Sequence, residues 1–199
     1  MAVNDALMRL YSRFVLSEKN IIIELQTGVT NYHLLSRYAE SAYIPGGQIR
    51  YPYIKDLTEE PFTEDVIRIL SVFNNRGDEL PLNDVNHPAS LFTPQLNVLQ
   101  VPCPVQGQAI AILYQAKPLK LVPENYTAQQ IPIPDVLEEA LKAYVGYKIF
   151  ATINSQEATA KAADYLGIYE NICAEVENKD LISNNTSMTN GRFEIRGWI

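Results

Sequence analysis

The spacing of apolar residues changes twice along the chain, and the first change marks the end of a helix-like stretch. From Asp5 to Ser17, apolar residues recur at three- and four-residue intervals, which is the period of an amphipathic helix. Asn4 directly precedes them and is a residue type that caps helix N-termini. We therefore expect one N-terminal helix within residues 1–19.

Short runs of β-branched and aromatic residues follow, separated by glycine and asparagine, as is typical of strands and tight turns. They predict a small antiparallel β domain of five to seven strands within residues 20–133. Asn75-Arg76-Gly77-Asp78 predicts a hairpin turn with Gly77 in the left-handed conformation. Residues 83–94 contain two prolines and predict a loop. The clearest strand-like runs are residues 21–25, 48–51, 66–73, 98–101 and 109–114.

A proline-rich stretch ends the β domain and leads into two helices. Residues 117–134 contain four prolines, which favour an extended crossover. Helical spacing begins at Asp135 and ends near Asn154, and Ser155 is suited to cap a second helix. Because the connection is short, residues 134–182 are expected to form an antiparallel helical hairpin.

The last part of the sequence combines a polar stretch with apolar residues. Residues 183–191 are polar and almost uncharged, but apolar side chains follow them. A segment that serves only solubility has no need of that much apolar surface. We predict that residues 183–199 form an extended arm that binds a partner. The alternative is that Trp198 folds back onto its own β domain and caps the core. The candidate partner-binding residues are Arg192, Phe193, Ile195, Arg196, Trp198 and Ile199.

Together these elements predict an α+β fold. An N-terminal helix and a C-terminal antiparallel helix pair flank an inserted small antiparallel β domain, and an extended arm follows. Apolar residues make up 47% of the chain, which is enough to bury a core. No apolar run approaches the roughly 18 residues of a membrane span, and no secretory signal precedes the first helix. We therefore expect a protein that stays in the cytoplasm where it is made and does not contact a membrane.

The charge balance argues against general binding to nucleic acid. The chain has 16 basic and 23 acidic residues and a net charge of −7, which opposes association with a phosphate backbone. Residues 135–182 contain nine acidic and four basic residues. Most of the negative charge is thus expected on the helical hairpin.

The sequence contains no pattern of residues that indicates catalysis or a cofactor. Phosphate-binding and nucleophile motifs are absent. His33 and His87 each lack a second ligand at metal-binding spacing, and the two cysteines do not form a C-x-x-C pair. We expect Cys103 and Cys173 to be two buried free thiols, with a single disulfide as the alternative. The prediction is therefore no catalytic residue, no metal and no cofactor.

Two further groups of residues have an ordinary and a functional interpretation. Adjacent acidic pairs are expected to be solvated, because neighbouring carboxylates on a helix point in different directions and the others lie in loops. A cluster of tyrosines is typical of a domain core or a subunit interface, and also of a carbohydrate-binding platform. The pairs are Glu59-Glu60, Glu64-Asp65 and Glu138-Glu139, and the tyrosines are Tyr38, Tyr43, Tyr51 and Tyr53.

The order of these elements resembles the head-to-tail adaptor (connector or neck) proteins of short-tailed bacteriophages. The most specific similarities are Ile131-Pro132-Ile133-Pro134-Asp135, which leads into the hairpin, and the terminal segment from Arg192 to Ile199. The resemblance implies a structural virion protein of the neck, without enzymatic activity, that assembles in the host cytoplasm. It also implies a homo-oligomeric ring, usually of twelve subunits, that joins the portal protein to a tail nozzle or tube protein. DNA would pass through the lumen of this ring without specific binding.

On this resemblance, we hypothesise that the helical hairpin forms the wall between neighbouring subunits. Its alanines leave little side-chain bulk, so another helix could approach closely there. Ala162→Glu is expected to block assembly while leaving the β domain folded. The alternative function, suggested by the tyrosines and carboxylates, is a small tail-associated module that binds or depolymerises carbohydrate.

Overall fold

The apolar residues gather in two separate cores, and the chain divides into two units accordingly. The structure is a computed structural model that describes residues 2–42, 52–57, 59, 61–122 and 130–182. We call Ser17–Pro118 the β unit, and Met1–Leu16 with Leu119–Ile199 the helical unit. The predicted α+β fold, with an N-terminal helix, antiparallel sheets and a C-terminal helix pair, is confirmed.

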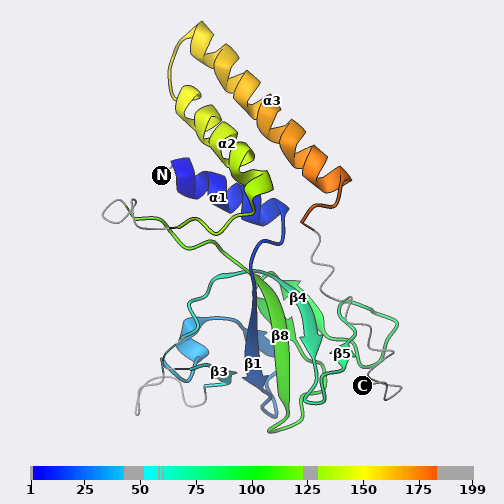
Figure 1. The fold of residues 1–199 in the computed structure, drawn as a ribbon. Coiled ribbons are helices and arrows are strands. Elements are labelled where there is room, and N and C mark those ends of the chain that lie inside the picture. Colours follow the sequence, from blue (N-terminus) through cyan, green and yellow to red (C-terminus); the bar gives the residue numbers. More distant parts are fainter. Residues whose placement is uncertain (1, 43–51, 58, 60, 123–129, 183–199) are drawn as a thin grey trace, which may run out of the picture. The chain divides into compact units, whose positions relative to one another are not determined.

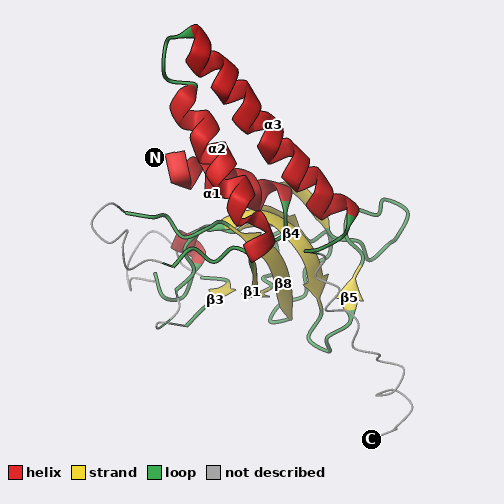
Figure 2. Cartoon of the chain, turned by 45° about the horizontal axis from the view of Figure 1, so that its top comes forward, coloured by secondary structure: helices red, strands yellow, loops and turns green. Residues whose placement is uncertain are grey.

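The β unit contains two antiparallel sheets. In the larger sheet, β1 and β4 flank β8 (Figure 2), and the strand order is β3-β1-β8-β4-β5. In the smaller sheet the order is β2-β7-β6. The larger sheet comprises β1 (Glu18–Glu24), β3 (Ile54–Lys55), β4 (Val66–Phe73), β5 (Glu79–Leu80) and β8 (Ala109–Ala116). The smaller sheet comprises β2 (Asn31–His33), β6 (Phe92–Gln95) and β7 (Val98–Gln100).

Strand β1 shows how the sequence pattern builds this core. Ile21 and Ile23 are buried, whereas Ile22 between them is 47% exposed, as the two-residue period of a strand requires. Ile23 lies in the same buried cluster as Ile110 of β8 and Ile54 of β3. The β unit therefore has a core of its own.

Two expectations for the β unit need correction. The described residues form eight strands, one more than the predicted maximum, because β3 and β5 have only two residues each and are too short to show a period. Residues 83–94 are not all loop, because Pro94 lies in β6. Proline is tolerated there because β6 is an edge strand whose register shifts between Phe92 and Gln95.

The predicted turn at Gly77 is confirmed. Gly77 has a φ of +85° and lies between the antiparallel strands β4 and β5. The side-chain oxygen of Asn74 accepts hydrogen bonds from the backbone N–H groups of Arg76 and Asp78, at 2.8 and 3.0 Å. An asparagine that closes the turn and a glycine that adopts the left-handed conformation explain why the chain reverses here.

The helical unit consists of α1 (Ala2–Arg13), a short 3-10 helix η3 (Asp135–Leu137), α2 (Glu138–Phe150) and α3 (Gln156–Asn178). Helices α2 and α3 lie side by side in opposite directions (Figure 1), as predicted for a hairpin. Ser155 caps α3, because its Oγ accepts a hydrogen bond of 3.1 Å from the backbone N–H of Ala158.

The predicted ends of two helices differ from the observed ones. Helix α1 already begins at Ala2, so Asn4 lies inside it and does not cap it. The Asn4 side chain instead makes two hydrogen bonds with the backbone of Leu121, of 2.9 and 3.0 Å. Helix α2 ends at Phe150, before Asn154, and the Thr152 hydroxyl bonds the carbonyl of Ile149 at 2.7 Å in the turn that follows. Among the described residues, no helix is long and apolar enough to cross a membrane.

Candidate assembly surface

Helix α3 has one buried face and one exposed face. The buried face carries Ala158, Ala162, Tyr169, Cys173 and Val176, which follow the three- and four-residue spacing of the sequence pattern. Ala162 is only 6% exposed. It therefore packs inside its own subunit and is not accessible to a neighbouring one.

The exposed face of α3 has the features that a subunit contact needs. Ala160, Ala163 and Gly167 are exposed at three- and four-residue spacing, so another backbone can approach closely. Three isoleucines of the hairpin remain about half exposed, namely Ile149, Ile153 and Ile168. Single exposed apolar residues are ordinary, but this hairpin combines several of them with small side chains.

The two hairpin helices approach each other closely at Gly146. A Cβ atom added to Gly146 would lie 3.1 to 3.2 Å from three ring atoms of Tyr165 on α3. The Tyr165 ring is stacked on Phe150, with centroids 5.5 Å apart and an angle of 12° between the planes. The aromatic ring therefore occupies the space that a larger residue at position 146 would take.

This contact gives a testable prediction with a matched control. Alanine in place of a helical glycine usually stabilises a protein by about 1 kcal/mol. We expect Gly167→Ala to show that gain, because nothing lies within 4 Å of its added Cβ. Gly146→Ala should be less stable than Gly167→Ala by about 1 kcal/mol or more, because the Tyr165 ring must move. Urea unfolding measures both variants, and equal gains would contradict the close approach.

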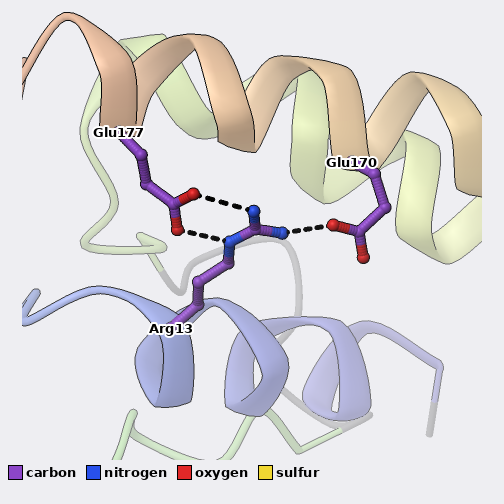
Figure 3. Close-up of polar contacts among 3 residues, drawn as sticks. All are labelled: Arg13, Glu170 and Glu177. Atoms are coloured by element: carbon purple, nitrogen blue, oxygen red, sulfur yellow. Dashed lines mark hydrogen bonds and ion pairs between the residues drawn. The ribbon is translucent and has the colours of Figure 1, made fainter.

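Three charged residues join α1 to α3, and we call Arg13, Glu170 and Glu177 the Arg13 cluster. Figure 3 shows the Arg13 guanidinium between the two carboxylates, with Arg13 on α1 and both glutamates on α3. Its Nε and Nη2 atoms donate to the two oxygens of Glu177 at 2.7 and 3.0 Å. Its Nη1 donates to Glu170 at 2.5 Å. This geometry is the bidentate one that makes Arg–carboxylate pairs strong.

The Arg13 cluster changes the ionisation of its members. The hydrogen bond with Glu177 raises the pKa of Arg13 above its usual value, and the same bond lowers the pKa of Glu177. The Arg13 Cζ lies over the ring of Tyr169, 5.9 Å from the ring centroid. Burial raises the pKa of the Tyr169 hydroxyl to about 12. Tyr169 is fully buried in the core of the helical unit.

The residues predicted to bind a partner all lie outside the described residues. They are Arg192, Phe193, Ile195, Arg196, Trp198 and Ile199, and their role is taken up below as a proposal. The hairpin that precedes them is described up to Ile182, which packs against the core of the helical unit.

Three members of the carboxylate pairs, Glu64, Asp65 and Glu138, make hydrogen bonds or ion pairs with neighbouring residues. Glu64 accepts hydrogen bonds of 2.7 Å from both the backbone N–H and the hydroxyl of Ser36, which lower its pKa. Asp65 contacts Lys19 at 2.6 Å and the hydroxyl of Tyr114 at 2.9 Å. Glu138 pairs with Lys142 at 2.7 Å on the surface of α2, and Glu60 lies outside the described residues.

The described tyrosines of the cluster belong to the core of the β unit. Tyr53 is 5% exposed, and its hydroxyl donates to the carbonyl of His33 at 2.8 Å. Its ring is stacked on Tyr38 with centroids 4.8 Å apart. Burial raises the pKa of Tyr53. Tyr43 and Tyr51 lie outside the described residues.

The remaining candidate residues have ordinary environments. The Nδ1 of His87 accepts a hydrogen bond from the backbone N–H of Ala89 within its own loop. Cys173 is buried, but Cys103 is exposed, so the expectation of two buried thiols is wrong for Cys103. Its turn, between Pro102 and Pro104, leaves the side chain at the surface. Within the described part of the chain, no three His, Cys, Asp or Glu residues are grouped so that they could hold a metal ion.

A family model described as SU10 adaptor protein matches residues 1–192. No curated protein matches the chain. The matched range covers the β unit, all three α-helices and the first of the predicted partner-binding residues, Arg192.

Proposed function

Because the chain belongs to the SU10 adaptor protein family, whose members are structural components of the phage virion, we propose that it forms a ring between portal and tail. In this proposal the ring has twelve subunits, assembles in the host cytoplasm and binds the portal protein on one side. A tail nozzle or tube protein binds on the other side. The observation that carries the proposal is the family match over both units of the fold.

The exposed charge of the hairpin supports a role beside passing DNA. Glu139, Glu157 and Asp164 are exposed and have no ion-pair partner within the described residues. Fixed negative charges repel the phosphate backbone, whereas a basic wall would bind it through release of counterions. An acidic wall would therefore let DNA slide through the lumen without specific binding.

The ring is tested by measuring the mass of the full chain under native conditions and by negative-stain imaging, with and without portal protein. The proposal predicts a closed particle of about twelve times 22.4 kDa. A chain that remains a monomer both alone and with portal protein would overturn it.

The alternative, a module that binds or cleaves carbohydrate, has less support. Its tyrosine platform would need exposed rings, but Tyr53 is buried, and Glu64 and Asp65 are engaged in structural hydrogen bonds. Turnover of peptidoglycan or capsule polysaccharide that disappears in Glu64→Gln would favour this alternative.

We extend the proposal to residues 183–199, as an arm that docks onto a neighbouring subunit or the portal. Seventeen residues at about 3.3 Å each reach roughly 55 Å when extended. Phe193, Ile195 and Trp198 are of the apolar and aromatic types that anchor interfaces, and full burial of each contributes roughly 1.5–3 kcal/mol.

Truncation after Ser183 separates this arm from the core-cap alternative. With a docking arm, the truncated subunit should keep its melting temperature and lose attachment to the ring or portal. With a Trp198 that caps the β unit, the melting temperature should fall while assembly persists. Differential scanning calorimetry and co-sedimentation with portal protein measure the two properties on the same samples.

A further inference from the structure

An apolar groove of about 500 Å³ lies on the helical unit. It is bounded by the start of α1, by the proline-rich segment before η3 and by the first turns of α2. Its volume falls within the range of roughly 300–1,000 Å³ that is usual for binding pockets. Its apolar residues are Val3, Ile131, Ile133, Leu141 and Val145.

Acidic residues at this groove outnumber basic ones. Asp135, Glu138 and Lys142 line it together with the apolar residues. Lys142 and Glu138 are paired with each other at 2.7 Å, so among the described residues that line the groove the unpaired charge is that of Asp135. Asp135 is exposed and has no ion-pair partner among the described residues. The groove therefore suits an occupant that carries apolar side chains next to positive charge.

The chain itself contains a segment of that chemistry. Residues 192–199 hold Phe193, Ile195 and Trp198 beside Arg192 and Arg196. Arginine forms bidentate pairs with carboxylates such as those of the groove, and aromatic residues are the usual anchors in apolar pockets. The segment and the groove are thus complementary in both polarity and charge.

We propose that the groove on each helical unit receives residues 192–199 of a neighbouring copy of the chain. The aromatic side chains of that segment enter the apolar part, and its arginines face Asp135 and Glu138. The inference rests on the proposed function, because the ring supplies the neighbouring copy. Residues 183–191 can span up to about 30 Å when extended, so the segment can leave its own subunit.

The experiment uses the full chain and its single tryptophan. Because Trp198 is the only tryptophan, the emission wavelength reports on this segment directly. Burial of the indole in a neighbour's groove should shift the emission to shorter wavelength as protein concentration rises. The concentration at the midpoint of that shift then measures the strength of docking.

A charge reversal at the edge of the groove gives the decisive comparison. The Glu138 side chain is 59% exposed, so Glu138→Lys should fold normally, which far-UV circular dichroism verifies. It should raise the midpoint concentration at least about tenfold, because it places a second positive charge beside Lys142 where arginines must bind. Glu139→Lys is the matched control, because Glu139 is exposed on the same helix and is not part of the groove. It should change the midpoint less than about twofold.

Charge exchange tests directly whether Arg196 is the partner of Glu138, since Arg196→Glu should restore docking in the Glu138→Lys background.

The inference is overturned if Glu138→Lys and Glu139→Lys have equal midpoint concentrations. It is also overturned if the emission shift is independent of concentration, which would mean docking within one chain, or if it needs portal protein. Negative-stain images separate the two proposals: rings without the emission shift overturn only the groove, whereas absence of rings both alone and with portal protein overturns the proposed function as well.

Discussion

Ala162→Glu is expected to unfold the helical unit, with a loss of at least about 3 kcal/mol in the free energy of unfolding. Ala162 is 6% exposed on the face of α3 that packs inside the subunit. A glutamate there must either bury a charge without a partner or separate the helices, and burial of an unpaired charge costs several kcal/mol. The loss of helical signal in far-UV circular dichroism during thermal unfolding measures this effect. A variant that melts like the wild type would contradict the packing of α3 against the rest of the unit.

Ala163→Glu makes the same change one residue later and provides the control. Ala163 is exposed, so this variant should keep the wild-type melting temperature. If the exposed face of α3 forms the wall between subunits, Ala163→Glu should nevertheless prevent ring formation. Native mass measurement decides this point, and normal rings from Ala163→Glu would exclude this face of α3 as the interface. Ala162→Glu alone could not decide whether this face is the interface, because loss of rings in that variant would follow from unfolding.

Local patterns predicted much of the fold where neighbouring residues determine the structure. The buried stripe of α3, its cap at Ser155 and the turn at Gly77 all depend on residues within a few positions of one another. Strand β1 was recognisable because it contains the β-branched run Ile21-Ile22-Ile23. Where an element is determined by residues close in the sequence, the sequence alone predicts it.

The predictions were wrong where a residue forms hydrogen bonds with a part of the chain that is distant in the sequence. Asn4 is suited by type to cap a helix, but its amide binds the backbone of Leu121, 117 positions away. The two-residue strand β3 exists because β1 provides a hydrogen-bonding partner for Ile54 and Lys55. Neither contact leaves a periodic signal in the sequence.

The candidate site was predictable only in part. The sequence placed Ala158 and Ala162 on one stripe of the second hairpin helix, but it did not show whether that stripe packs inside the subunit or against a neighbouring one. The groove also escaped prediction, because it forms where folding brings Val3 to Ile133 and Val145. A pattern within one helix cannot show such a meeting of three segments.

Arg13→Met is expected to lower the free energy of unfolding by about 1–2 kcal/mol. The side chain of Arg13 is 22% exposed, and those of Glu170 and Glu177 are 46% and 45% exposed. Hydrogen bonds of a charged group contribute about 1.5–3 kcal/mol when buried, but solvent screening reduces this at a partly exposed site. Methionine keeps much of the packing against the Tyr169 ring, so the variant reports mainly on the ion pairs. Arg13→Lys should recover only part of the loss, because lysine cannot form the bidentate bond to Glu177.

The pH dependence identifies the ion pairs as the source of this stability. The hydrogen bond from Arg13 lowers the pKa of Glu177 below its usual 4.5. A carboxylate with a lowered pKa contributes stability above the pKa of the unfolded chain, and this contribution is lost as the pH falls through the folded-state value. The difference between wild type and Arg13→Met should therefore be full at pH 7 and shrink as the pH falls below 4.5. Urea unfolding followed across this pH range measures it. A difference that stays constant in acid would mean that Arg13 stabilises the unit through its contact with the Tyr169 ring, because that contact does not depend on the charge of Glu177.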